Sequence, residues 1–270
     1  MHGGDTSRSW VLSAAAVILV GSMLAGCDRL GSPEQRGQNL LGRGDYAGAV
    51  KAYGEAIAAG RDLPVAYAWR CYAYLAQGDD EAAARDCTEA LELVPDTAAE
   101  SAPARWEILN NRGVALLNLA RRDEAEADFD AAIALKADYP DAYANRGRSF
   151  LDRENWERAI EDLTKAIELK ADLAEAYGNR GLAYEGKGDD EMALADYDKA
   201  IEISHDTQAY FNRAMLQYTL GRFDLAYDDF AQVVEREKDP NRYLRFMAQQ
   251  QLKLLENRPT AVPTAPPAEP

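Results

Sequence analysis

The fold is decided by one stretch, residues 176–203, which reads AYGNRGLAYEGKGDDEMALADYDKAIEI. It is the clearest copy of a repeat that recurs along the chain, and an arginine marks its first half. Equivalent arginines stand at Arg36, Arg70, Arg112, Arg146, Arg180 and Arg213, with successive spacings of 34, 42, 34, 34 and 33 residues. A period near 34 predicts supersecondary repeats that stack on their neighbours to bury a shared core.

The composition favours helices and excludes one class of partner. The chain has 270 residues and a net charge of −16, alanine and glutamate are abundant, and runs of β-branched residues are scarce. Such residues favour the helical state. The acidic balance argues against nucleic acid as a partner, because phosphate binding needs clustered lysines and arginines.

Residues 1–26 are typical of a bacterial lipoprotein signal peptide. Residues 10–24 form a mainly apolar run that is shorter than the ~20 residues of a membrane-spanning helix. The run ends in Leu24-Ala25-Gly26-Cys27, which resembles the lipobox of bacterial lipoproteins. The resemblance implies that Cys27 carries lipid (palmitate) and begins the mature chain. The alternative is an ordinary secretory signal with an incidental cysteine.

The lipobox resemblance also implies a location. The chain would be anchored to the membrane of the bacterial cell envelope and would face the periplasm. Asp28 resembles the inner-membrane retention signal of enteric lipoproteins, which slightly favours the inner over the outer membrane. Residues 27–31 would form a short tether, because Ser32 and Gln35 make a capping box that starts the first helix.

The repeated stretch resembles the tetratricopeptide repeat. Its matching positions are Tyr177, Arg180, Gly181, Tyr184, Ala193, Tyr197 and His205. Arg180 and His205 depart from the leucine and proline of the family pattern. Small residues at Gly181 and Ala193 let two antiparallel helices approach closely, and the tyrosines fill the space around that contact.

The resemblance implies an all-α, right-handed α-solenoid of about six helix-turn-helix repeats plus a C-terminal capping helix, within residues 32–257. The repeats are expected near residues 30–63, 64–97, 106–139, 140–173, 174–206 and 207–240, and the cap at 241–257. In the cap, we expect Leu244, Met247, Leu252 and Leu255 to face the array, and Arg242, Arg245, Gln250 and Lys253 to face water. The proline-rich residues 258–270 are expected to be a disordered tail.

The 42-residue spacing places eight surplus residues near residues 96–105. We interpret them as a surface loop or a lengthened helix, and a partner-binding loop is the alternative.

Candidates for catalysis are few. One histidine, His2, lies in the signal peptide, and the other, His205, lies in a turn; no phosphate loop or nucleophile motif occurs. The acidic pairs at residues 79–80 and 189–190 stand where second helices begin, so we interpret them as helix caps rather than metal ligands. We therefore expect no enzyme activity, no cofactor and no metal site.

Cys71 and Cys87 are the two cysteines that follow the lipobox. They occupy the close-contact position of the first helix and the aromatic position of the second helix in the second repeat. Antiparallel helices would bring these positions together, and an oxidising compartment would permit a disulfide. Two buried thiols are the alternative.

Five of the repeat arginines are followed sixteen residues later by an aspartate: Asp86, Asp128, Asp162, Asp196 and Asp229. Arg36 lacks its aspartate, because Ala52 takes that place. We interpret the pattern as a ladder of partly buried ion pairs within repeats, and ligand binding by the arginines is the alternative.

Asparagines precede four of the arginines: Asn111, Asn145, Asn179 and Asn212. The first helices of the family line a concave surface, where this position resembles the asparagine ladder with which O-GlcNAc transferase holds an extended peptide. An amide both donates and accepts hydrogen bonds, so it can hold a peptide backbone; a structural role is the alternative. Neighbouring candidates on that surface are Tyr72, Asn110, Arg148, Asp152, Glu175, Leu182, Phe211, Met215 and Tyr218.

The sequence thus predicts a membrane-anchored adaptor that binds a protein or an extended peptide on its concave face. Small arrays of this kind resemble lipoproteins that dock cell-wall hydrolases, pilus secretins or outer-membrane assembly machinery. The alternative is a self-associating structural module, for instance a homodimer. A third reading, an accessory hydrolase, is disfavoured by the lack of a catalytic constellation.

Overall fold

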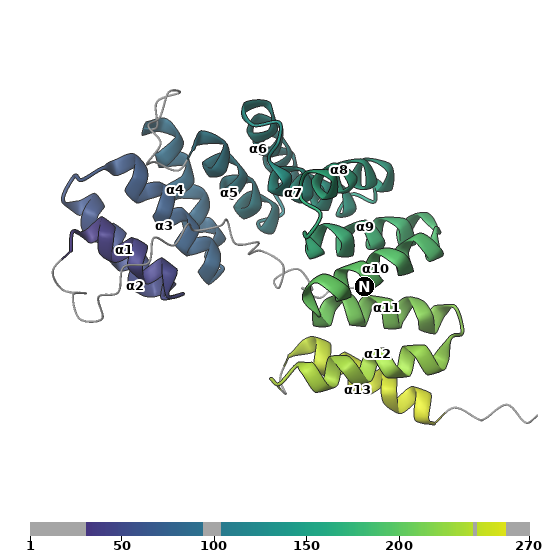
Figure 1. Cartoon of the computed structure of the whole chain (residues 1–270). Coiled ribbons are helices and arrows are strands. Elements are labelled where there is room, and N and C mark those ends of the chain that lie inside the picture. Colours follow the sequence, from purple (N-terminus) through teal and green to yellow (C-terminus); the bar gives the residue numbers. More distant parts are fainter. Residues whose placement is uncertain (1–30, 94–103, 240–241, 258–270) are drawn as a thin grey trace, which may run out of the picture. The chain divides into compact units, whose positions relative to one another are not determined.

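The computed structural model describes residues 31–93, 104–239 and 242–257 (Figure 1). Within these ranges there are thirteen α-helices and no strand, so the predicted all-α fold class is confirmed. The predicted signal peptide with Cys27, most of the insertion near residues 96–105, and the tail 258–270 lie outside the described residues.

The helices follow one another in pairs joined by short turns. The pairs are α1 (Pro33–Gly42) and α2 (Tyr46–Ala58), α3 (Leu63–Gln77) and α4 (Asp80–Leu93), α5 (Arg105–Asn118) and α6 (Arg122–Leu135), α7 (Pro140–Leu151) and α8 (Trp156–Leu169), α9 (Ala174–Lys187) and α10 (Asp190–Ser204), and α11 (Thr207–Thr219) and α12 (Phe223–Arg236). The cap is α13 (Tyr243–Glu256). Each pair corresponds to one sequence repeat.

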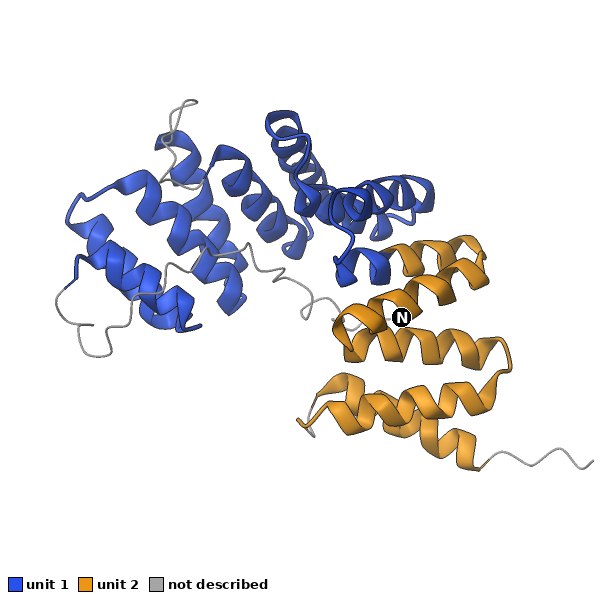
Figure 2. Cartoon of the chain, viewed as in Figure 1, with its two compact units in different colours: residues 1–179 blue, residues 180–270 orange. Residues whose placement is uncertain are grey.

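The chain divides into two compact units, residues 1–179 and residues 180–270 (Figure 2). In unit 1, every helix from α1 to α7 packs against the next, and the first helices also meet across repeats, α3 with α5 and α5 with α7. In unit 2, α10 packs on α11, α11 on α12 and α12 on α13, and α11 also meets α13. The same helix-on-helix packing therefore builds both units.

A glycine in the first helix and a ring in the second hold a typical pair together. A Cβ added at Gly113 would lie 2.6 Å from Phe129, and one added at Gly181 would lie 2.6 Å from Tyr197. Both rings are fully buried. Any larger residue at these glycines would push the ring out, which is why the repeat keeps a small residue there.

The predicted capping is present at two of the three helix starts for which it was expected. Ser32 and Gln35 form the expected capping box, and the carboxylate of Asp79 accepts a hydrogen bond of 3.1 Å from the backbone N–H of Ala82. For Asp189 the prediction is wrong, since its side chain caps no backbone N–H. Its carboxylate instead lies 3.5 Å from a lysine ammonium on the preceding helix.

Helix α13 covers the end of the array. Leu244 and Ala248 are its buried residues. The expectation that Arg245 faces water is wrong, because its guanidinium donates to the backbone carbonyls of Val234 and Glu237. The last carbonyls of a helix have no partner within that helix. Arg245 therefore satisfies the end of α12 and fixes α13 against it.

Candidate partner-binding surface

The first helices of unit 1 form a continuous layer. Helices α3, α5 and α7 contact one another across repeats, whereas the second helices contact neighbouring repeats chiefly through these first helices. In a curved stack, the helices that approach most closely lie on the inner side. We call the side of the first helices of unit 1 that faces away from the second helices the inner surface, and we include in it residues 174–179 of α9.

Two predicted site residues meet between adjacent first helices. The Nδ2 of Asn145 on α7 donates a hydrogen bond of 2.9 Å to the Oδ1 of Asn110 on α5. Asn110 is buried, with 5% of its surface exposed. This bond holds α5 and α7 in register, so the two amides have a structural role, which was the alternative to peptide binding.

Two other asparagines keep amide groups without a protein partner. Asn111 is half-buried on α5, and its side chain makes no hydrogen bond within the described residues. Asn179 is 8% exposed, and its Nδ2 finds no acceptor among the described residues. A buried N–H left unpaired costs about 1–3 kcal/mol. Asn179 therefore has a hydrogen-bond donor that a ligand carbonyl or a water molecule would satisfy.

The aromatic and basic candidates of unit 1 lie on other first helices, α3 and α7. Tyr72 on α3 is half-buried, and its ring lies edge-on to Trp69 with 6.2 Å between the ring centroids. Burial raises the pKa of the Tyr72 hydroxyl. Arg148 is half-buried on α7 and is already engaged with other groups of the chain.

The candidate side chains in unit 2 mainly contact other residues of their own repeat. The Oδ1 of Asn212 accepts a hydrogen bond of 2.7 Å from a glutamine one turn earlier in α11. The ring of Phe211 packs edge-on against the buried ring of Phe230, with centroids 5.7 Å apart. Met215 and Tyr218 are half-buried on the same helix. These side chains therefore contribute more to packing than the sequence predicts.

The predicted arginine–aspartate ladder is present. In each pair, Nε and Nη2 of the arginine donate to the two carboxylate oxygens of the aspartate sixteen residues later. The distances are 2.6 and 2.9 Å for Arg70–Asp86, 2.7 and 2.7 Å for Arg112–Asp128, 2.7 and 2.7 Å for Arg146–Asp162, 2.8 and 2.8 Å for Arg180–Asp196, and 2.8 and 2.7 Å for Arg213–Asp229. All five aspartates are buried. Pairing within repeats is confirmed.

In three of the five ladder arginines, the remaining guanidinium nitrogen, Nη1, reaches the preceding repeat. Nη1 donates from Arg112 to Thr88 at 3.3 Å, from Arg146 to Asp130 at 2.6 Å, and from Arg213 to Asp198. Each acceptor stands two residues after the ladder position of the preceding repeat. The arginines thus join neighbouring repeats as well as the helices of one repeat, a role that the sequence interpretation missed.

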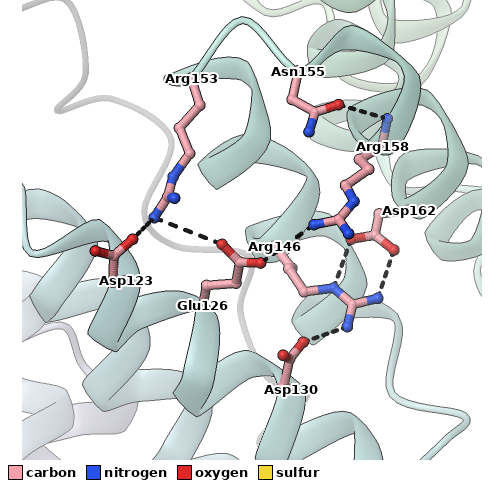
Figure 3. A network of polar contacts seen from close by, with 8 residues as sticks. All are labelled: Asp123, Glu126, Asp130, Arg146, Arg153, Asn155, Arg158 and Asp162. Atoms are coloured by element: carbon pink, nitrogen blue, oxygen red, sulfur yellow. Dashed lines mark hydrogen bonds and ion pairs between the residues drawn. The ribbon is translucent and has the colours of Figure 1, made fainter.

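Figure 3 shows this link between α6 and the following pair, α7 and α8. Arg146 lies between Asp162 of its own repeat and Asp130 of the preceding one. Farther along α6, Asp123 pairs at 2.6 Å with Arg153, in the turn after α7. The acidic side of α6 is therefore matched to basic groups of the next repeat.

The ladder arginines are already satisfied by the chain. Hydrogen bonds to aspartates raise the pKa of Arg70, Arg112 and Arg146. In the first repeat, which lacks the aspartate, Arg36 pairs with Glu55 instead. Arg36 also donates a hydrogen bond of 2.9 Å to the backbone carbonyl of Gly31. A guanidinium whose donors are taken has little left for a ligand, so the geometry favours the structural interpretation.

A disulfide joins Cys71 and Cys87, whose Cα atoms lie 5.4 Å apart. Both residues are fully buried between α3 and α4. In the second repeat, the two half-cystines take the place that the glycine and the ring hold in other repeats. Here a covalent bond ties together the helix pair that packing ties together elsewhere.

A cavity of about 490 Å³ lies between α4, α5 and α6. Its lining mixes both charges, with Arg85, Arg121, Glu81 and Glu124 among the side chains. Arg121 and Glu124 pair with each other at 2.7 Å. Because its lining carries charges of both signs, the cavity gives no indication of a ligand class.

Among the described residues, no group of three or more His, Cys, Asp or Glu side chains is placed to hold a metal ion. No helix in the described ranges combines the length and the apolar character that a membrane span requires.

Sequence comparison finds relatives that are similar to this chain over a short region. The chain is 31% identical over 102 residues to dynein axonemal assembly factor 4 of Rattus norvegicus, which is 38% of this chain and 24% of that protein. This chain therefore spans about a quarter of the length of that relative.

Structure comparison finds similar helical arrays. MamA is 27% identical, with a TM-score of 0.52 over 63% of this chain and 94% of MamA. A tetratricopeptide repeat protein from Parabacteroides merdae is 20% identical, with a TM-score of 0.63 over 83% of each chain. The latter similarity shows a shared fold.

Four family models match the repeats identified above. Three are described as tetratricopeptide repeat and match residues 35–96 and 75–142, 174–206 and 207–240, and one described as TPR repeat matches residues 147–188. Together they cover every helix pair of the structure. With the glycine–ring contacts and the paired helices of constant period, these matches place the chain in the tetratricopeptide repeat family.

Proposed function

We propose that this chain is a membrane-anchored adaptor of the bacterial cell envelope that holds a segment of a protein partner on the inner surface of unit 1. The observation that carries the proposal is the buried Nδ2 of Asn179, which has no protein partner; Asn111 holds the same repeat position on α5 and is half-buried. An amide can hold the backbone of an extended peptide without reading its side chains. The fold itself typically serves as a non-catalytic scaffold for protein–protein interaction.

The other predicted residues of the inner surface indicate the character of the partner. Tyr72 offers a half-buried aromatic ring on α3, where it lies edge-on to Trp69. The chain as a whole carries a net charge of −16. Such a charge attracts basic segments and repels acidic ones. The segment bound would therefore be extended, neutral to basic, and rich in apolar side chains.

Two features of the cysteines support the proposed location in the cell envelope. Cys27 ends the lipobox-like sequence, and its lipid would anchor the chain. The disulfide between Cys71 and Cys87 supports export, because disulfides persist in oxidising compartments such as the periplasm. Labelling with a palmitate analogue should mark the wild-type chain and not Cys27→Ser. Equal labelling of both would contradict the anchor.

The binding surface is tested by affinity capture from envelope extract. The variant Asn111→Ala/Asn179→Ala should capture at least ten-fold less partner than the wild-type chain. Glu161→Ala, an exposed change on second helix α8, should behave as wild type. Circular dichroism of all three proteins checks that the array remains folded. Recovery of the same partners in the same amounts by the double variant would rule out these amides as the binding site.

A further inference from the structure

The outer face of the capping helix is apolar. The last helix of a repeat array normally presents a polar face, because no further repeat covers it. On α13, however, Tyr243 is 53% exposed, Phe246 is 53% exposed and Leu254 is 56% exposed. Leu244, which packs inward from the same helix, is 9% exposed. The cap therefore closes the core on one side and leaves a second apolar face uncovered.

These side chains form one stripe. At 100° per residue, positions 243, 246, 250, 254 and 257 fall within about 80° of one another around the helix axis. Gln250 stands at the centre and Asn257 at one end. We call Tyr243, Phe246, Gln250, Leu254 and Asn257 the α13 stripe. It runs the whole length of the helix, about 21 Å at 1.5 Å per residue.

The α13 stripe is complementary to a second copy of itself. A two-fold axis at Gln250 would set two α13 helices antiparallel, with Phe246 of one copy level with Leu254 of the other. An isologous interface requires this property, since the same patch must serve both copies. At the axis, the amide of Gln250 can both donate to and accept from its own copy.

Charge opposes a second copy less at this helix than at the acidic faces of the chain. The chain is strongly acidic, with a net charge of −16, so most of its surfaces repel another copy. Helix α13 contains Arg245, Lys253 and the single acid Glu256, and Arg242 stands just before it. Lys253 would lie level with Met247 of the second copy, away from the other Lys253. The stripe is thus an apolar surface without clustered acids.

We propose that the α13 stripe is a self-association surface through which two copies of this chain pair antiparallel. One helix face of this length buries less than the ~1,000 Å² typical of stable complexes. The pairing is therefore weak in solution and depends on concentration. The proposal is independent of the inner surface, which belongs to other helices, and it leaves that surface open to a partner.

The first test measures oligomeric state with the full chain in detergent solution. Light scattering with size exclusion should show a dimer fraction that grows with protein concentration. Phe246→Glu should weaken the association at least ten-fold. Met192→Glu is the matched control, because Met192 on α10 is 51% exposed and the change adds the same charge. A wild-type chain that stays monomeric to about 0.5 mM, well above typical weak affinities, would overturn the proposal.

The second test determines the arrangement of the two helices by cysteine cross-linking. Gln250→Cys should form an intermolecular disulfide readily, because the two copies of this residue meet at the axis. Tyr243→Cys should not, since its two copies would stand about 21 Å apart, beyond the ~7 Å Cα–Cα limit of a disulfide. Equal cross-linking at both positions would overturn the antiparallel arrangement.

A third variant distinguishes self-association through the α13 stripe from coverage of the stripe by residues 258–270. A chain that ends at Asn257 should associate as the full chain does. If only the truncated chain associates, residues 258–270 occupy the stripe and the proposal fails.

Discussion

At the scale of single residues, the ladder arginines stabilise the array through more than one partner each. Arg146 contacts Asp162 within its repeat and Asp130 of the preceding repeat, whereas Arg112 has one carboxylate, Asp128, and the hydroxyl of Thr88. Removing one member of a buried ion pair costs more than the pair contributes, because the other charge stays buried without compensation. The cost should therefore depend on what partner remains.

Two aspartate substitutions test this dependence. Asp128→Ala leaves Arg112 with no carboxylate in the ladder and should lower the free energy of unfolding by about 2–3 kcal/mol. Asp162→Ala leaves Arg146 paired with Asp130 and should cost about 1 kcal/mol less than that. The shift of the urea midpoint measures both. Equal shifts would show that the contact with the preceding repeat adds nothing.

At the scale of elements, the glycine–ring contact decides how closely two helices of a repeat approach. A Cβ at Gly113 would meet the Phe129 ring at 2.6 Å, far inside van der Waals contact. A Cβ at Gly54, inside α2, would have as its nearest neighbour the end of a flexible arginine side chain, at 3.6 Å. The two glycines are thus alike in helical context and opposite in the space around them.

The substitution Gly113→Ala should therefore destabilise the array by about 1–3 kcal/mol, because the ring must leave its place in the core. Gly54→Ala should stabilise it by about 0.5–1 kcal/mol, since alanine favours the helix over glycine. Thermal unfolding followed by circular dichroism measures both changes. If the two variants shift the melting temperature in the same direction, the close approach at Gly113 is not what holds α5 to α6.

The helices and their pairing could be predicted from the sequence because both follow from local patterns. The period, the glycine and the ring recur at fixed offsets, and so do Arg112 and Asp128. Contacts that depend on distances between repeats could not be predicted in this way. The Nη1 acceptors differ from repeat to repeat, as Thr88 and Asp130 show.

The candidate site shows the same division between local and long-range information. The positions of Asn111 and Asn179 follow from the repeat, but the bond of Asn145 to Asn110 depends on how far apart α5 and α7 lie. The position of Arg245 could not be predicted for a related reason. A charged side chain predicts exposure to water, and only folding brings the backbone carbonyls at the end of α12 within hydrogen-bond distance of its guanidinium.

At the scale of the whole molecule, a repeat array has no single core, so its stability is a sum over repeats and over the interfaces between neighbours. The second repeat differs from the others in being cross-linked. Its disulfide spans 16 residues, and in the loop-entropy model such a bond contributes about 3 kcal/mol. The second repeat should consequently be more stable than the repeats around it. Through its interfaces it should also stabilise the adjacent repeats.

Hydrogen exchange with and without a reductant tests this view of the molecule. Reduction of Cys71–Cys87 should speed amide exchange most in α3 and α4, and less in α2 and α5, which pack against that pair. Exchange in α11 and α12 should not change, because a nearest-neighbour array transmits a local loss of stability only to adjacent repeats. The variant Cys71→Ala/Cys87→Ala controls for effects of the reductant itself and should no longer respond to it. An increase of exchange that is uniform from α1 to α13 would instead mean that the array opens as one cooperative block.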